Sequence, residues 1–357
     1  MWSTRREFLA QTLTLTSVAT SNPLVGALSN PTANRFDVNR YHTPYKLGRL
    51  VLEKSGQPSA FDSQAVDGIF VFSHENRFYM TYLGFDGVGY QTGIAVSGDL
   101  INWEKRGLIF ARDPSKPWLR NNAALTSIVR NDDIWSTAPL KRIKGRYLGT
   151  WHAYPGTGYE EGRAVIGLAW SDDLMHWEAG EPILRAEDGA PWERGGLYRS
   201  FLMEDKDVFY LFYNAKNVPD WPWFEQWGVA ISHDLVTWKR SPLNPLVRNG
   251  SVGAPDELFA SDPYVVRDGS KWIAYYFGFD VHKHARNLLA IGDSPFRFEK
   301  VGCLALDIGA PGSIDSQHAH KPVIISWKGD LYQFYTAVDA PNQLNRGISV
   351  ARSRPWA

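Results

Sequence analysis

The sequence predicts an all-β fold: a five-bladed β-propeller of four-stranded antiparallel blades, with the ring closed by an N-terminal strand. Three observations lead to this prediction: a motif that recurs along the chain, an aromatic strand pattern before each copy, and a further strand pattern after most copies. The clearest copies read Gly-x-Ala-x-Ser-x-Asp-Leu-x-x-Trp and occupy residues 93–104, 167–178 and 228–239, with weaker copies at 288–299 and 347–356. Their starts lie 59 to 74 residues apart, and such self-similarity is the signature of a repeat architecture.

Each unit begins with an inner strand, followed by a short strand rich in aromatic residues. These aromatic runs alternate with a period of two, as strands do, and they lie at residues 78–82, 146–151, 209–213, 272–276 and 331–335. The repeated motif then supplies a third strand and a turn, and a segment such as 106–110 supplies the fourth. Four antiparallel strands repeated in this way are typical of a propeller blade.

The fifth unit lacks a fourth strand because the sequence stops at Ala357. The segment 46–53, which precedes the first unit, has the character of the missing strand. We expect it to pair with the last unit and close the ring, which would leave no free edge.

Composition excludes several classes of function. The chain has 357 residues with 38 Lys and Arg against 38 Asp and Glu, so there is no basic excess for binding nucleic acid or an anionic membrane. Its one cysteine excludes an internal disulfide framework, and no apolar run of about 20 residues is present to span a bilayer. The 15 Trp, 16 Tyr and 18 Phe suit both a large β core and a ligand with flat apolar faces.

The N-terminal segment 1–35 has the pattern of a twin-arginine export signal. Arg5 and Arg6 are followed by Phe8-Leu9 and a weakly apolar stretch that ends at Leu28. We therefore expect a periplasmic or secreted protein in which residues 36–357 form one catalytic propeller domain. The alternative is a basic N-terminal tail without a targeting role.

Propeller connections predict where a site lies. The connection into each inner strand and the loop between the second and third strands fall on one face, at the central axis. Asp67 and His320 occupy equivalent positions, each 11 residues after the glycine of a Gly-x-Pro repeat, and Asp262 takes the corresponding place in the fourth unit. Arg199 lies at this level in the third unit.

The loops on the same face supply further polar and aromatic side chains as candidate substrate-binding residues. With Arg199, these are Asp86, His152, Asn214, Lys216, Trp223, Asp280, His282, Gln317, His318 and Asp339. The same loops also bring Glu160, Glu161 and Glu225 to this face.

Two carboxylates and a third titratable group around a neutral pocket are suited to glycoside cleavage, in which one group activates water or attacks and another protonates the leaving oxygen. Asp67, Asp262 and His320 are the candidate catalytic residues. The structural alternative is that the aspartates only cap strand ends. A second alternative uses His282, His284, His318 and His320 as metal ligands, although the cofactor expectation is that none is required.

At these residues the chain resembles the five-bladed propeller glycoside hydrolases of families 43, 32, 68, 117 and 130. The resemblance covers about residues 40–357 and is carried by the repeated turns, by Asp67 and by the segment 261–272, which begins Ser-Asp-Pro-Tyr. An Asp, Asp and His in the first, fourth and fifth blades is most similar to family 117, whose members are inverting exo-enzymes that release 3,6-anhydro-L-galactose.

The resemblance implies that Asp67 is the base, that Asp262 tunes charge and holds the sugar, and that His320 is the acid. It implies an exo-acting enzyme that removes a terminal sugar from an oligosaccharide. The alternatives are a family 43-like arabinofuranosidase or xylosidase, a family 32-like fructosidase, and a propeller that binds carbohydrate without cleaving it.

Overall fold

The computed structural model describes residues 37–339 and 345–356, and the fold below concerns the compact unit Val38–Ala357. The predicted export signal lies outside the described residues and stays a prediction, as does the domain boundary at residue 36. Among the described residues no helix is long and apolar enough to cross a membrane.

The described residues are built almost entirely of antiparallel strands, in groups that follow the sequence repeat. The first two groups form separate sheets. Their strands are β2 (Ala65–His74), β3 (Arg77–Phe85), β4 (Tyr90–Ser97), β5 (Trp103–Phe110), β6 (Ala124–Ile128), β7 (Tyr147–Ala153), β8 (Val165–Ser171) and β9 (Glu178–Leu184).

The later groups join into a twelve-stranded sheet, because single parallel pairs link β12 to β14 and β16 to β18. Its strands are β10 (Gly196–Asp205), β11 (Val208–Lys216), β12 (Glu225–Ser232), β13 (Lys239–Arg240), β14 (Phe259–Asp268), β15 (Lys271–Phe279), β16 (Ala285–Ser294), β17 (Arg297–Leu306), β18 (His318–Trp327), β19 (Asp330–Val338), β20 (Arg346–Arg352) and β1 (Tyr45–Lys46). Short 3-10 helices occupy Val38–Tyr41, Pro117–Leu119, Ala186–Asp188 and Pro191–Glu193.

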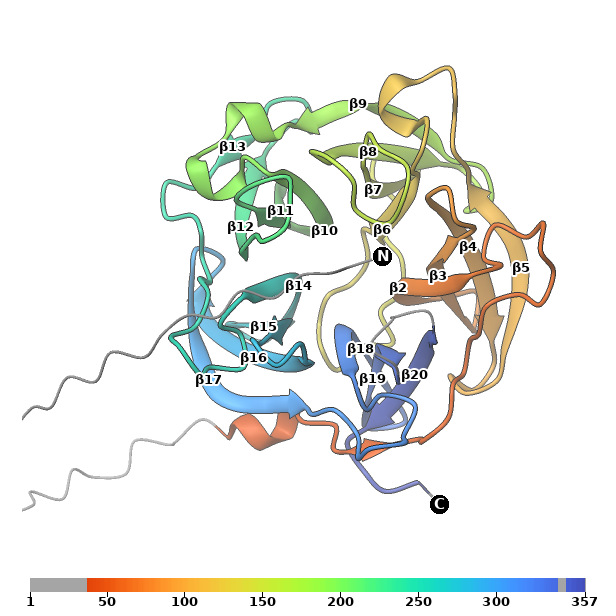
Figure 1. The fold of residues 1–357 in the computed structure, drawn as a ribbon, viewed down its shortest axis with the longest axis vertical. Helices are drawn as coiled ribbons and strands as arrows, with labels where there is room; N and C mark the ends of the chain where they lie inside the picture. The colour runs from red at the N-terminus through yellow and green to blue at the C-terminus, as the bar shows by residue number, and fades with distance from the viewer. Residues whose placement is uncertain (1–36, 340–344, 357) are drawn as a thin grey trace, which may run out of the picture. The chain divides into compact units, whose positions relative to one another are not determined.

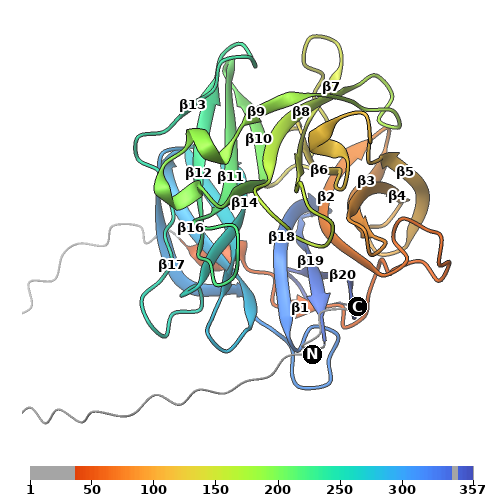
Figure 2. The ribbon, with the colours of Figure 1, turned by 45° about the horizontal axis from the view of Figure 1, so that its top comes forward.

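The groups follow one another around a common centre, with β2, β6, β10, β14 and β18 innermost (Figure 1). Each predicted aromatic run falls in the second strand of its group, and the last strands β5, β9 and β17 lie at the outer edge (Figure 2). The predicted all-β class with four-stranded antiparallel units is therefore confirmed.

The N-terminal segment pairs with the last strand, as predicted, but over fewer residues than 46–53. Tyr45 and Lys46 pair antiparallel with β20, and beyond them Leu52 forms a single bridge to Ile348. None of the sheets in the described residues closes on itself. The number of blades and the closure of the ring stay predictions.

The repeated turn has a local physical cause. The Ser97 hydroxyl accepts the Leu100 amide at 3.0 Å, the Asp99 carboxylate accepts the Ile101 amide at 2.9 Å, and the Trp103 indole donates to the Leu100 carbonyl at 3.1 Å. The same leucine-to-tryptophan bond recurs in the next two copies at 2.9 and 3.3 Å. The motif therefore encodes a turn whose tryptophan packs against the core.

The innermost strands share a β-bulge at the level of the predicted site. In each bulge the register shifts around a residue with positive φ: Gly68, Arg199, Asp262 and Lys321. Asp67 and His320 both precede that residue, so they are equivalent as expected. The expectation for Asp262 is wrong by one position: Ser261 holds the place of Asp67, and Asp262 occupies the bulge itself.

Candidate active site

A cavity of about 800 Å³ opens on the face that the connections predict. Its walls come from the starts of β10, β14 and β18 and from the loops before β8, β12 and β16. This size falls within the range of small-molecule sites. Carboxylates line one part of the cavity and aromatic rings another, and the two parts meet at Glu225.

Glu225, the first residue of β12, is 3% exposed and is held by three donors. Its Oε2 accepts the Ser261 hydroxyl at 2.6 Å and the Asn214 amide at 3.0 Å, and its Oε1 accepts the Trp223 indole N–H at 2.8 Å. Hydrogen bonds from three donors favour the ionised form of a carboxyl group and fix its orientation. Glu225 is thus suited to act as a base or nucleophile.

Glu160 lies in the loop between β7 and β8 and lines the same cavity. Burial and the nearby charge of Glu225 raise the pKa of Glu160 to about 7. The Glu160 backbone carbonyl accepts the Lys216 ammonium at 3.1 Å, which ties this loop to β11. A carboxyl group with a pKa near neutrality can hold a proton and deliver it at physiological pH.

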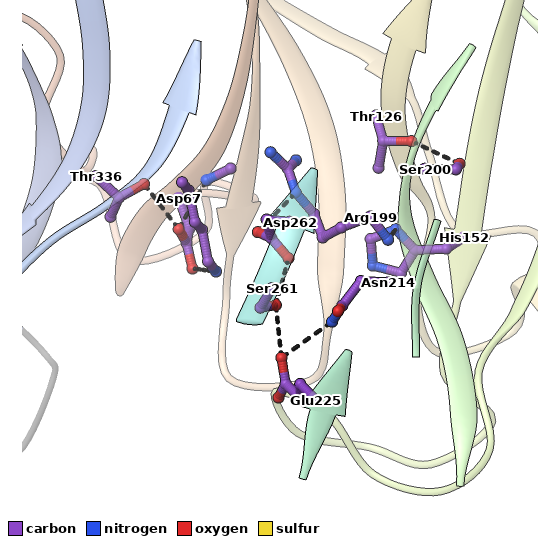
Figure 3. A network of polar contacts seen from close by, with 12 residues as sticks. Asp67, Thr126, His152, Arg199, Ser200, Asn214, Glu225, Ser261, Asp262 and Thr336 are labelled. Atoms are coloured by element: carbon purple, nitrogen blue, oxygen red, sulfur yellow. Dashed lines mark hydrogen bonds and ion pairs between the residues drawn. The ribbon is translucent and has the colours of Figure 1, made fainter. Parts of the chain in front are cut away.

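A series of polar contacts continues from Glu225 toward the axis (Figure 3). The Ser261 hydroxyl lies 3.1 Å from Asp262 Oδ1, and Asp262 Oδ2 accepts Arg199 Nε at 3.1 Å. Although Arg199 favours the charged form, burial dominates and raises the pKa of Asp262. Among the described residues, Arg199 Nη1 and the Tyr159 hydroxyl have no hydrogen-bond partner, and both residues line the cavity. A polyhydroxylated ligand would satisfy such groups.

Asp67 is 1% exposed and fully engaged, and it does not belong to the cavity lining. Its Oδ2 contacts Arg346 at 2.6 Å and Lys321 at 2.7 Å, while its Oδ1 accepts the Gly68 amide and the Thr336 hydroxyl at 2.7 and 2.9 Å. Burial acts to raise the pKa of Asp67, but the two cations overcome this effect and hold it well below the ordinary value. These contacts give Asp67 the properties of a fixed counter-ion.

His320 and His318 both line the cavity from β18. His320 Nδ1 lies 3.0 Å from the Thr336 carbonyl oxygen, which can only accept, so that nitrogen carries the proton and Nε2 is an acceptor when the ring is neutral. Burial and Lys321 lower the pKa of His320 well below its ordinary value. Burial likewise lowers the pKa of His318 to about 3, and its Nδ1 accepts the Ala285 amide at 3.2 Å.

Aromatic rings form the opposite wall. Trp223 stacks parallel to Phe259 with a 5° interplanar angle, and Phe259 stacks on Phe279 at 4.9 Å. Trp221 meets Trp223 edge to face at 5.1 Å and is 54% exposed at the rim. This aromatic wall, Trp221 with Trp223, Phe259 and Phe279, leads from Glu225 to the solvent.

The predicted site residues divide into three sets by position. Those that line the cavity are Arg199, Trp223, Asp262, His318 and His320. Those that support it from behind are Asp67, His152, Asn214 and Lys216. Those outside the cavity lining are Asp86, Asp280, His282, Gln317 and Asp339.

The contacts of two residues in this last set explain their position. Asp86 forms an ion pair with Arg112, and Asp280 forms one with Arg286. Their carboxylates are therefore occupied outside the cavity by neighbouring arginines.

The sequence prediction did not include Arg346, which lines the cavity and contacts Asp67. It immediately precedes the last copy of the repeated motif, and this position was the only available signal. Lys321 follows His320 directly, and the bulge turns its side chain toward Asp67.

The alternative metal site does not assemble in the described residues. No group of three or more His, Cys, Asp or Glu side chains there is arranged to hold a metal ion. His284 Nδ1 contacts Arg286 at 3.3 Å, and His282 is exposed. Whether the protein needs a cofactor stays a prediction.

Comparison with known proteins supports a glycosidase. A solved structure of a BT0996 complex with RGII is 28% identical with a TM-score of 0.76, covering 89% of this chain and 94% of that one. A second, described as a glycoside hydrolase, is 27% identical with a TM-score of 0.75, covering 88% and 93%. A thermostable family-43 glycoside hydrolase, 16% identical with a TM-score of 0.56 over 80% of this chain and 88% of that one, shares the fold.

Curated sequences add little about function. The uncharacterized proteins MT1551 and Rv1502 of Mycobacterium tuberculosis are each 26% identical over 175 residues, or 49% of this chain. The chain spans about half the length (54%) of these relatives. No protein-family model matches it. The predicted resemblance to propeller glycoside hydrolases is confirmed by the structures, and the resemblance to family 117 stays a prediction.

Proposed function

We propose that the protein is an exo-acting glycoside hydrolase, built as a five-bladed propeller, that removes a terminal sugar from an oligosaccharide. The observation that carries the proposal is the carboxyl pair Glu160 and Glu225 in one cavity, the first with a raised pKa and the second held by three donors. Two carboxyl groups in different environments are the equipment of glycoside cleavage.

In this proposal Glu160 is the general acid. Its carboxyl group is protonated in about half of the molecules at pH 7, and it donates that proton to the glycosidic oxygen as the bond breaks. Glu225 stays ionised and acts on the anomeric carbon, either directly or through a water molecule.

These roles replace those that the family 117 resemblance implies for Asp67 and His320. A base needs a free lone pair, and both oxygens of Asp67 are engaged by cations or donors. An acid needs a proton to give, and burial keeps His320 neutral with its one proton bound to a carbonyl. Asp67 and His320 serve better to fix the charge and shape of the sugar pocket.

Inversion at the anomeric centre is the outcome that the family resemblance implies, and we keep it as the proposal. Proton NMR of the first product formed would test it. An inverted anomer makes Glu225 the base that activates water, and a retained anomer makes it the nucleophile.

The shape of the cavity supports the exo mode of action. The polar end lies at the propeller axis, among Arg199, Asp262 and His320, and suits one terminal sugar. The aromatic wall leads outward, and the exposed ring of Trp221 offers a flat apolar face to the sugar on the leaving-group side.

The direct test is a screen of the purified protein against terminal aryl glycosides and natural oligosaccharides, with and without chelator, reading released monosaccharide. The panel includes arabinosides, xylosides, fructosides, 3,6-anhydro-L-galactosides and RGII-derived oligosaccharides, because one similar structure is described as an RGII complex. Release of one sugar by the wild type and not by Glu225→Gln supports the proposal. Glycan binding without release would favour the carbohydrate-binding propeller, and loss of activity with chelator would favour the metal alternative.

Export by the twin-arginine pathway is part of the proposal and rests on residues 1–35 alone. Fractionation of cells that express the full chain, compared with an Arg5→Lys, Arg6→Lys variant, tests it. Retention of that variant in the cytoplasm, with the wild type exported, is the expected result.

A further inference from the structure

One hydroxyl group lies between two carboxyl groups on the cavity wall. Ser261 Oγ is 2.6 Å from Glu225 Oε2 and 3.1 Å from Asp262 Oδ1, and Ser261 is fully buried. A serine hydroxyl has a single proton to donate. If both carboxyl groups were ionised, that proton could serve only one of them, and a lone pair of the serine would face the other anion.

The shorter contact shows where the serine proton lies. A separation of 2.6 Å is typical of an O–H donor to an ionised carboxylate. The 3.1 Å contact to Asp262 is then satisfied only if Asp262 supplies a proton of its own.

We propose that Asp262 is a neutral, protonated carboxylic acid in the resting protein, that its Oδ1–H donates to Ser261 Oγ, and that the Ser261 hydroxyl donates to Glu225. Asp262 and Ser261 are then positioning residues that hold Glu225 ionised and correctly oriented. The inference about Glu225 rests on the proposed function, whereas the protonation state of Asp262 does not.

The charged groups that face Asp262 are compatible with this state. Arg199 from β10 reaches only Oδ2, which leaves Oδ1 to Ser261, and Lys321 from β18 is engaged by Asp67 at 2.7 Å. Glu225 from β12 and Glu160 from the β7–β8 loop are anions or potential anions that oppose a further negative charge. Asp262 is 5% exposed, and burial raises its pKa.

The proposal makes an unusual demand on mutagenesis. In Asp262→Asn, the amide nitrogen can donate to Ser261 and the amide oxygen can accept Arg199, so every contact of the protonated acid is kept. Asparagine also tolerates the positive φ of 52° at this position. We expect kcat/KM within about 3-fold of wild type, whereas a carboxylate needed for its charge would lose about 100-fold or more.

Ser261→Ala should break the link. Glu225 loses one of its three donors, so its pKa rises and the acidic limb of the kcat/KM profile moves to higher pH. Ser200→Ala is the matched control, because Ser200 is a buried serine on the neighbouring inner strand whose hydroxyl contacts Thr126 and not a carboxyl group. The control should leave the acidic limb in place.

A spectroscopic measurement on the full-length protein decides the protonation state without reference to activity. The infrared difference spectrum of wild type minus Asp262→Asn at pH 7 should show loss of the C=O stretch of a protonated carboxylic acid. Loss of an ionised carboxylate band instead overturns the proposal, as does a folded Asp262→Asn variant with 100-fold lower kcat/KM. If no glycoside is cleaved at all, the proposed function fails, and the infrared result still decides the state of Asp262.

Discussion

Glu160→Gln is the variant that tests the proposed reaction most directly. An ordinary glutamate with a pKa of 4.5 is protonated in about 0.3% of molecules at pH 7, and a pKa of about 7 raises this to about half. Burial beside Glu225 therefore supplies roughly 150-fold more acid at pH 7. Since glutamine has no proton to transfer, kcat/KM should fall by about 10²- to 10⁴-fold on substrates with poor leaving groups.

The pH profile distinguishes loss of the acid from general damage. Catalysis needs Glu160 protonated, so kcat/KM of the wild type should fall as pH rises through about 7, with about a tenth left at pH 8. Assays on a natural oligosaccharide and on a dinitrophenyl glycoside, which needs no acid, would be compared. Glu160→Gln should lose the alkaline limb and spare the dinitrophenyl substrate, and Glu161→Gln, its exposed neighbour, should keep the limb.

Stability provides an independent check. Between pH 4.5 and about 7 the folded state binds more protons at Glu160 than the unfolded state, so stability falls as pH rises through this window. Glu160→Gln should remove this dependence and melt at a higher temperature than wild type at pH 8. An alkaline limb that survives in Glu160→Gln would refute the assignment of the acid.

Three further substitutions test the surrounding walls. Asp67→Asn leaves two buried cations without their counter-ion and should cost about 3–5 kcal/mol of stability, complete at pH 5 because the wild-type contribution is lost only as pH falls below the ordinary pKa; an unchanged melting temperature with lost turnover would restore Asp67 as the base. His320→Gln should reduce hydrolysis of activated and natural substrates equally, and a larger loss on the natural one would restore His320 as the acid. Trp221→Ala should raise KM for oligosaccharides about 3- to 10-fold with kcat little changed, while Phe224→Ala, 47% exposed and outside the cavity lining, should not.

The sequence was sufficient for the class of fold because its main signal is local. Each Ser-x-Asp-Leu-x-x-Trp turn closes with hydrogen bonds between residues two or three apart, so the pattern can be recognised within a short stretch of residues. The closing segment was harder to predict. The 46–53 segment pairs with β20, about 300 residues away, and nothing local indicates that regular pairing ends after Lys46.

The location of the site was predictable, but the charge state of its residues was not. Asp67 and His320 were placed correctly at the starts of two inner strands. The role of Asp67 depends on Arg346, which lies 279 residues away in the sequence. Similarly, Glu160 and Glu225 come from separate loops, and only their shared cavity distinguishes them from other loop carboxylates.

The repeated bulge explains why a correct repeat led to an incorrect alignment at Asp262. Side chains alternate between the two faces of a strand, so a shift of one residue exchanges the group that faces the cavity wall for the group in the bulge. At Gly68 the bulge has no side chain, and a Cβ there would lie 2.9 Å from Arg199 Nη1. The other bulges carry Arg199, Asp262 and Lys321, so a single backbone irregularity brings two cations and one carboxyl group to the axis. The chemistry of this propeller is therefore set by the bulge residues together with their neighbours, Asp67, Ser261 and His320.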